Sequence, residues 1–265
     1  MIHPHTYIHP NARLATNVKV DPFTVIHQDV EIGEGTWIAS NVTIMEGARI
    51  GKNCRVFPGA VIAAIPQDLK FKGEYSTVEI GDNTTIREFV TINRGTKDRE
   101  KTVVGSNCLI QAYCHLAHDC VVGSNCVMSN NTQVAGHVII EDWAILGGMC
   151  ALHQFVRIGQ HSFISGGSLI GKDVPPFIKA ARNPLSYAGV NSVGLKRRGF
   201  SNERINDILN IYRCIYNKGM NTTQALEYIE EELPASDERD EIVTFVRESG
   251  RGIIKRFTKG SGDED

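Results

Sequence analysis

Apolar residues recur every six positions along the first two thirds of the chain. From Ile2 to Ile170 there are 29 positions in this six-residue register, and 26 of them carry Ile, Leu, Val or Met. A period of six is a multiple of the two-residue period of a strand and does not match the helical period of 3.6. The pattern therefore predicts short strands joined by turns. Three positions break the register, in two segments that we interpret as loops, 63–79 and 93–103. These positions are Asp68, Glu74 and Asp98.

A second column of small or β-branched residues lies four positions after the first. Six of the seven cysteines fall in this column. A disulfide or zinc framework has no reason to follow a six-residue period, whereas a small side chain that packs in an interior does. We therefore predict that these cysteines are buried thiols of the core. They are Cys54, Cys108, Cys114, Cys120, Cys126 and Cys150.

The chain also repeats at three times six residues. The segment VGSNC at 104–108 returns as VGSNC at 122–126, 18 residues later. Hexapeptide repeats are typical of a parallel β-helix. Three short sides per coil give a triangular prism, in which strands of adjacent coils lie about 4.8 Å apart.

Beyond the repeat, the apolar spacing becomes helical. Apolar residues between Ser201 and Gly219 follow i, i+3, i+4 and i+7 spacing, which predicts an amphipathic helix. Thr222 or Thr223 is expected to cap a second helix, and Ser236 a third. The expected organisation is a mainly β prism followed by a small α-helical domain with a disordered tail. The two domains are expected at residues 1–190 and 191–265.

Composition and charge exclude some functions. The net charge of −2 gives no electrostatic indication of binding to nucleic acid or to an anionic membrane. The sequence contains no run of 18 or more apolar residues, so no membrane insertion is expected. The first residues, MIHPHTYIHPNARL, lack a basic segment followed by an apolar one, and we expect a cytoplasmic protein without a signal peptide.

The segment HLAHDC, residues 115–120, carries the candidate chemistry. Asp119 and His137 are 18 residues apart, so they are expected to stack on adjacent coils. Together with His118 and His153, they are expected near one edge of the prism. Two kinds of site fit these residues. Three histidines can hold a catalytic zinc ion. Alternatively, one histidine acts as a general base, with Asp119 orienting its ring.

Several segments resemble those of the UDP-N-acetylglucosamine O-acyltransferases of lipid A biosynthesis, which are hexapeptide-repeat acyltransferases. They are QDLKFKGE, VEIGD, INRGT, HLAHDC, AGHV, GGMCALHQF and GLKRRGF. The resemblance runs over nearly the whole chain and implies a left-handed parallel β-helix that assembles as a homotrimer. It also implies transfer of a 3-hydroxyacyl chain to the 3-hydroxyl of UDP-N-acetylglucosamine. The acyl donor is the phosphopantetheine thioester of acyl carrier protein, and no cofactor or metal is expected. Another hexapeptide-repeat acyltransferase of nucleotide sugars, or a zinc-dependent enzyme like the carbonic anhydrases that share this prism, remains an alternative.

The same resemblance assigns roles to individual residues. It implies that His118 is the general base, that Asp119 supports it, and that the backbone N–H of Gly136 stabilises the oxyanion. Gly166 matches the position that sets the acyl chain length. The other matching positions are expected to bind substrate. They are Gln67, Asp68, Lys70, His115, His137, His153, Gln154, Asn191, Arg197 and Arg198.

Overall fold

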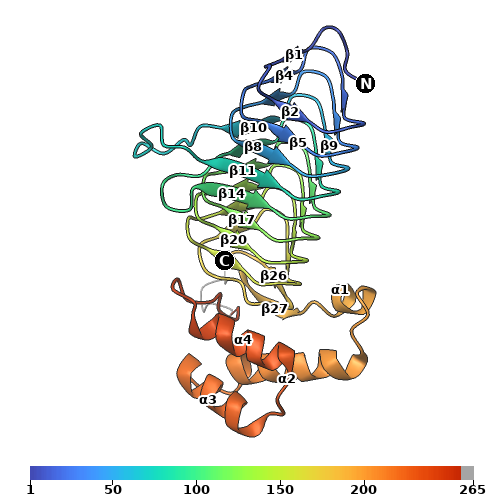
Figure 1. Cartoon of the computed structure of the whole chain (residues 1–265). Helices are drawn as coiled ribbons and strands as arrows, with labels where there is room; N and C mark the ends of the chain where they lie inside the picture. The colour runs from blue at the N-terminus through green and yellow to red at the C-terminus, as the bar shows by residue number, and fades with distance from the viewer. Residues whose placement is uncertain (258–265) are drawn as a thin grey trace, which may run out of the picture.

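The chain winds into a triangular prism with a cluster of helices at its C-terminal end (Figure 1). This computed structural model describes residues 1–257, so the expected disordered tail lies outside the described residues. Three parallel sheets form the sides of the prism, and each coil passes from the first sheet to the second and then to the third. The fold is a left-handed parallel β-helix; the repeat predicted the parallel β-helix, and the family resemblance implied its handedness.

Most strands of the prism are two residues long, because each side of a coil is short. The first sheet contains β1 (Tyr7–Ile8), β4 (Val25–Ile26), β7 (Thr43–Ile44), β10 (Val61–Ala64), β13 (Thr91–Asn93), β16 (His115–Leu116), β19 (Gln133–Val134), β22 (Ala151–Leu152) and β25 (Leu169–Ile170). The second contains β2 (Arg13–Leu14), β5 (Glu31–Ile32), β8 (Ala48–Ile50), β11 (Thr77–Ile80), β14 (Lys101–Val104), β17 (Val121–Val122), β20 (Ile139–Ile140) and β23 (Arg157–Ile158). The third contains β3 (Lys19–Val20), β6 (Trp37–Ile38), β9 (Arg55–Val56), β12 (Thr85–Ile86), β15 (Leu109–Ile110), β18 (Val127–Met128), β21 (Ile145–Leu146), β24 (Phe163–Ile164), β26 (Ile178–Ala181) and β27 (Ser186–Val190).

The six-residue register forms the hydrophobic core of the prism. His115 pairs with Gln133, and Gln133 pairs with Ala151, so positions 18 residues apart lie on adjacent coils. From Val20 to Ile170, every apolar residue of the register is buried. The 18-residue coil predicted from the repeat is therefore confirmed.

The cysteines of the second column link neighbouring coils. The Sγ of Cys120 donates to the carbonyl oxygen of Ala135 at 3.1 Å, as the hydroxyl of Thr36 donates to Gly51 at 2.8 Å. All seven cysteines are free and buried, which confirms the prediction. Burial raises the pKa of the Cys120 thiol to about 12, so this thiol stays protonated and is a poor nucleophile.

Two loops replace corners of the prism, both at the edge between the first and second sheets. The first loop, residues 65–76, joins β10 to β11, and the second loop, residues 94–100, joins β13 to β14. The first loop projects from the edge of the prism in Figure 1. The strands on either side reach into the segments 63–79 and 93–103 that the sequence marked as loops.

In the described part of the chain, four helices follow β27 and lie at the end of the prism (Figure 1). They are α1 (Ser192–Arg197), α2 (Asn202–Asn217), α3 (Thr222–Glu232) and α4 (Asp237–Arg247). The fully buried Tyr212 of α2 donates a hydrogen bond from its hydroxyl to the Pro176 carbonyl oxygen at 2.6 Å, which ties the helices to the last coil. Within residues 1–257, no helix is long and apolar enough to cross a lipid bilayer.

The helix starts agree with the sequence except at α3. Ser236 caps α4, as predicted, and α2 begins directly after its cap, Ser201, where the sequence predicted the start of a helix. Asn221 caps α3, so the expected cap at Thr222 or Thr223 is wrong. The side chain of Asn221 accepts from the Gln224 N–H, and the Gln224 side chain accepts from the Asn221 N–H, forming a capping box. The short helix α1 was not predicted.

Candidate active site

Three side chains stack at one edge of the prism, between the first and second sheets. Asp119, His137 and Phe155 occupy the same corner position on three successive coils, with φ of 60°, 63° and 66°. This left-handed conformation is unusual for residues other than glycine, asparagine and aspartate. The rings of His137 and Phe155 are stacked, with centroids 4.6 Å apart. Both loops cross this edge on the coils before Asp119, so polar side chains from several coils meet here.

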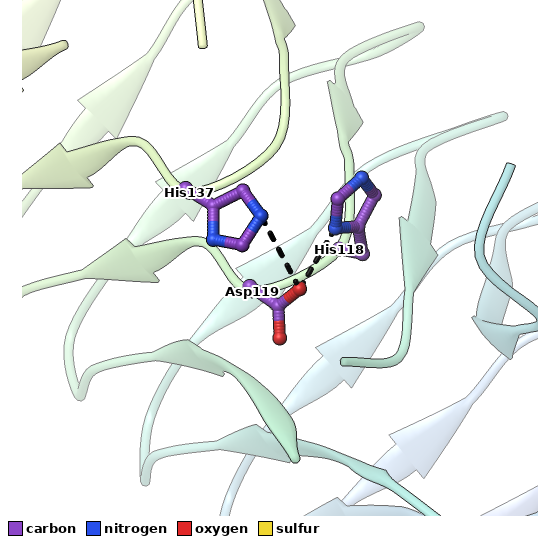
Figure 2. Close-up of side chains that lie close together, drawn as sticks. All are labelled: His118, Asp119 and His137. Atoms are coloured by element: carbon purple, nitrogen blue, oxygen red, sulfur yellow. Dashed lines mark hydrogen bonds and ion pairs between the residues drawn. The ribbon is translucent and has the colours of Figure 1, made fainter. Parts of the chain in front are cut away.

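His118 is held by a hydrogen bond to the next residue in the chain. Its Nδ1 lies 2.8 Å from Oδ2 of Asp119 (Figure 2). A carboxylate can only accept, so this bond places the proton of the neutral imidazole on Nδ1. Nε2 then carries the free lone pair, and it lies 3.9 Å from Oδ2 of Asp68 in the first loop. The imidazole can therefore take a proton through Nε2.

The second loop fixes the Asp119 carboxylate. Thr96 donates to it twice, from its backbone N–H at 2.9 Å and from its hydroxyl at 2.6 Å. The backbone N–H of Arg99 adds a third contact at 3.3 Å. Burial alone would raise the pKa of Asp119, but the hydrogen bonds from Thr96 and His118 outweigh burial and lower it. Asp119 is therefore ionised at neutral pH.

A cavity of about 350 Å³ opens in front of these residues. Its wall includes His118, His137 and Gln154 from the prism, together with Asp68 and Lys70 from the first loop. All three residues that break the six-residue register line this one cavity. They are Asp68, Glu74 and Asp98.

Gly136 lies one coil beyond His118, directly against its ring. A Cβ added to Gly136 would lie 2.6 Å from Cε1 and 2.7 Å from Nε2 of His118. Only a residue without a side chain allows this approach. Within the described part of the chain, the Gly136 N–H has no hydrogen-bond acceptor, so it is available to a ligand beside Nε2.

His137 approaches the same carboxylate from the next coil. Its Nε2 lies 3.7 Å from Oδ2 of Asp119, and its ring meets the His118 ring edge-on at 5.1 Å (Figure 2). Burial lowers the pKa of His137, although the charge of Asp119 opposes this effect. His137 is therefore neutral at pH 7. Ligand atoms of His118, Asp119 and His137 lie within 4.8 Å of one another, close enough to converge on a metal ion.

Other residues predicted for the site lie elsewhere. His115, outward on β16, has its Nδ1 2.7 Å from the Thr91 hydroxyl. His153 is exposed, and it does not line the cavity; the residue stacked above His137 is Phe155. His153 directly follows β22 and therefore lies at the same edge between the first and second sheets, as expected, but the 18-residue spacing from His137 leads to position 155. Gln67 is exposed in the first loop.

The remaining predicted residues lie away from this edge of the prism. Asn191 and Arg198 contact His161 at the edge between the second and third sheets. Nδ2 of Asn191 donates to the His161 carbonyl oxygen at 2.9 Å, and Nη1 of Arg198 lies 3.3 Å from Nδ1 of His161. Arg197, in α1, is exposed. Gly166 is exposed at the edge between the third and first sheets.

Sequence reasoning missed Thr96 and Phe155. Thr96 lies within an irregular loop, where no period indicates what it contacts. The position of Phe155 was available, because it follows His137 by one 18-residue coil. The three polar residues that interrupt the apolar register were a further signal of the site. A polar residue at a position that is otherwise buried indicates that the chain departs from the coil there.

Two protein-family models match the chain. One, described as Udp N-acetylglucosamine O-acyltransferase, Domain 2, matches residues 173–254. The other, described as Bacterial transferase hexapeptide (six repeats), matches residues 29–64 and 101–136.

Similar proteins cover nearly the whole chain. It is 44% identical over 260 residues to acyl-(acyl-carrier-protein)–UDP-N-acetylglucosamine O-acyltransferase of Herminiimonas arsenicoxydans, over 96% of this chain and 99% of the relative. A solved UDP-N-acetylglucosamine acyltransferase from Bacteroides fragilis matches with a TM-score of 0.94 and 51% identity, over 96% of this chain and 100% of that one. The enzyme from Francisella novicida matches with a TM-score of 0.93 and 42% identity, over 96% and 94% of the two chains.

Proposed function

The chain belongs to the UDP-N-acetylglucosamine O-acyltransferase family, and from this premise we propose a specific reaction and mechanism for it. It transfers a 3-hydroxyacyl chain from the phosphopantetheine thioester of acyl carrier protein to the 3-hydroxyl of UDP-N-acetylglucosamine. Such a transfer would begin lipid A biosynthesis. The observation that carries the proposal is the pair formed by His118 and Asp119, whose free Nε2 faces a polar cavity.

In this mechanism, Nε2 of His118 removes the proton from the sugar hydroxyl while the oxygen attacks the thioester carbonyl. The imidazolium that forms is stabilised by the ionised Asp119. Collapse of the tetrahedral intermediate breaks the C–S bond, and the imidazolium returns its proton to the leaving thiolate. The steps need no cofactor, because the proton only moves from the hydroxyl to the sulfur. A positioned general base typically contributes 10²–10⁴-fold to the rate.

The Gly136 N–H is the proposed donor to the developing oxyanion. It belongs to the residue that packs directly against the His118 ring, and it lacks an acceptor among the described residues. A preorganised donor of this kind stabilises charge that exists only near the transition state. Because Gly136 packs against His118, the oxygen of the thioester carbonyl can contact the Gly136 N–H. The carbon of the same carbonyl then faces the sugar hydroxyl that His118 activates.

The first loop is the proposed contact for the nucleotide sugar. Asp68 accepts a hydrogen bond from the Lys70 N–H at 2.9 Å and also lies near His118, so the loop is folded toward the base. The Asp68 carboxylate can accept from sugar hydroxyls, and the exposed Lys70 ammonium can pair with the pyrophosphate as a point charge. His115, His137, His153 and Gln154 complete the proposed substrate contacts on the prism, with Gln67 in the loop.

We also propose a homotrimer. The residues expected to bind one substrate pair lie on all three edges of the prism in a single chain: His118, Arg198 and Gly166 are each on a different edge. Neighbouring copies would bring Asn191, Arg197, Arg198 and the acyl-length position Gly166 to a site built on His118. Multi-angle light scattering is expected to give three times the chain mass of 29.2 kDa. A monomer at assay concentration would contradict this part of the proposal.

A metal-dependent enzyme is the second candidate, because His118, Asp119 and His137 converge. A zinc ion would need direct bonds of about 2.0–2.2 Å to their nitrogen and oxygen atoms. The Asp119 oxygens already accept hydrogen bonds from Thr96, Arg99 and His118. A metal would have to replace some of these bonds, which favours the metal-independent mechanism.

The proposed reaction is tested by incubating the protein with 3-hydroxyacyl carrier protein and UDP-N-acetylglucosamine. Mass spectrometry is expected to find one acyl group on the sugar nucleotide, and NMR is expected to place it on O3. Acylation of an analogue with an amine at that carbon, with none of the hydroxyl substrate, would redirect the proposal to an N-acyltransferase. A cytoplasmic location is part of the same proposal, since both substrates are water-soluble.

A further inference from the structure

Glu74 joins the two loops at the candidate active site. Its Oε2 accepts from the backbone N–H of Lys72 in its own loop at 2.8 Å, and its Oε1 accepts from the backbone N–H of Lys97 in the second loop at 3.2 Å. Hydrogen bonds from the backbone N–H groups of Glu74 itself, Lys72 and Lys97 lower the pKa of this carboxyl. It is therefore ionised at neutral pH and accepts with both oxygens.

A second contact joins the loops nearby. The Arg94 guanidinium, at the start of the second loop, lies over the ring of Phe71 in the first loop, 5.8 Å from its centroid. This is near the outer limit for a cation–π interaction, so the contact is weak. The Glu74 hydrogen bond is the more directional of the two links.

Lys97, whose N–H donates to Glu74, directly follows Thr96, the residue that holds the Asp119 carboxylate. Thr96 contacts the Asp119 carboxylate through its N–H and its hydroxyl, and that carboxylate bonds to Nδ1 of His118. A continuous set of hydrogen bonds and one peptide unit thus runs from the first loop to the general base. Each group in this series donates to or accepts from the next one. A shift of the first loop is therefore transmitted to the orientation of the His118 ring.

We propose that Glu74 is a positioning residue that links the nucleotide-sugar loop to the general base through Lys97, Thr96 and Asp119. The inference rests on the proposed function, in which Asp68 and Lys70 of the first loop contact the acceptor. Binding of the acceptor holds the first loop against the prism. Through Glu74 the second loop then keeps Asp119, and therefore His118, in the orientation that accepts the hydroxyl proton.

Glu74→Gln breaks this link with little change of volume. A carboxylate offers an oxygen to each of the two N–H groups, whereas an amide offers one oxygen and presents an NH₂ group to the other N–H. Glu79→Gln is a matched control, since it removes the same charge on β11. Among the described residues, the Glu79 carboxylate accepts hydrogen bonds only from Nζ of Lys101, the first residue of β14, at 3.3 and 3.2 Å. An exposed ion pair of this kind contributes little.

The test is a double-mutant cycle on kcat with Glu74→Gln and Thr96→Val. Glu74→Gln is expected to lower kcat roughly tenfold, the scale of one lost hydrogen bond, with the carrier-protein KM unchanged. Because both changes act through one path, the double variant is expected to be no slower than Thr96→Val alone. Multiplicative effects of the two changes would overturn the inference, as would an effect of Glu74→Gln on the acceptor KM alone.

Hydrogen exchange gives a second readout that does not depend on activity. Peptides covering residues 94–100 are expected to exchange faster in Glu74→Gln than in the wild type and in Glu79→Gln. Equal exchange in all three proteins would overturn the link between the loops. Failure of the wild type to transfer an acyl group would instead count against the proposed function, and the exchange result would still decide whether Glu74 holds the second loop.

Discussion

The Thr96 hydroxyl donates a hydrogen bond of 2.6 Å to Oδ2 of Asp119, although the two residues are 23 positions apart in the chain. The same oxygen lies 2.8 Å from Nδ1 of His118. One carboxylate oxygen therefore joins an irregular loop to the proposed base. The bond explains how a residue outside the repeat shapes the chemistry of a residue inside it.

Thr96→Val removes this hydroxyl and keeps the shape of the side chain. It leaves one oxygen of a fully buried carboxylate with one donor fewer, which costs on the order of 1–3 kcal/mol. We expect kcat to fall about 10-fold to 10²-fold, because about 1.4 kcal/mol corresponds to a tenfold change in rate. Steady-state kinetics measure the effect. Thr96→Ser keeps the hydroxyl and is expected to stay within a few-fold of the wild type; equal loss in both variants would contradict the role of this bond.

Gly136→Ala tests the contact between Gly136 and His118. The new Cβ would lie 2.6 Å from the imidazole, so the ring must move away from its place over the cavity. We expect kcat to fall by about 10² or more, the contribution of a positioned general base, while the protein stays folded. Circular dichroism checks that the variant is folded, and steady-state kinetics measure the loss of kcat. At the control site Gly171, an added Cβ meets no atom within 4 Å, and Gly171→Ala is expected to be fully active. An active Gly136→Ala would show that the approach is not required.

The pH dependence of stability is expected to depend on His161. Its ring is stacked between Trp143 and Phe177, and Nδ1 faces Arg198. Burial, with the charge of Arg198, lowers its pKa to about 4, although Asp142 opposes this. The unfolded chain binds this proton below about pH 6.5 and the folded chain only near pH 4, so stability is lost as the pH falls through this window.

His161→Gln is expected to flatten that dependence. Lowering the His161 pKa from 6.5 to about 4 means that the free energy of unfolding is about 3 kcal/mol smaller at pH 4 than at pH 7 because of this residue. Urea unfolding at pH 7 and pH 4, at one fixed protein concentration, is expected to show a smaller difference in unfolding free energy in the variant by this order. An unchanged difference would mean that His161 titrates normally in the folded protein.

The six-residue register was sufficient to predict the coil, its core and the buried cysteines. Each of these depends on local spacing, and a solenoid turns spacing directly into contacts between coils. The stacking of Asp119 on His137 was predicted in the same way, because the two residues are one 18-residue coil apart. The helix α1 was missed because six residues give too little periodicity to detect.

The parts of the site outside the register were less accessible from sequence. Thr96 acts through the path of the second loop, which no repeat fixes. His153 lies at the expected edge, but it does not line the cavity, and the ring that stacks on His137 is that of Phe155, two residues later. Asp98 and Glu74 were seen only as breaks in the pattern, although the cavity they line is the reason for those breaks.

Removal of metal separates the two candidate mechanisms. We expect the activity of the purified enzyme to survive dialysis against a chelator, because the proton transfer uses His118 and the charge is stabilised by the Gly136 N–H. Elemental analysis of the same sample checks that the metal is gone. Activity that is lost on chelation and returns with zinc would assign the cluster of His118, Asp119 and His137 to a metal ion.

The most direct measurement is the rate of acyl transfer from 3-hydroxyacyl carrier protein to UDP-N-acetylglucosamine by the wild type and by His118→Ala. His27→Ala, on an N-terminal coil away from the cavity, is the matched control. We predict that kcat falls at least about 10²-fold in His118→Ala and is unchanged in His27→Ala, since a general base contributes at least that factor. Wild-type activity together with a His118→Ala rate within a few-fold of it would contradict the assignment of His118 as the base.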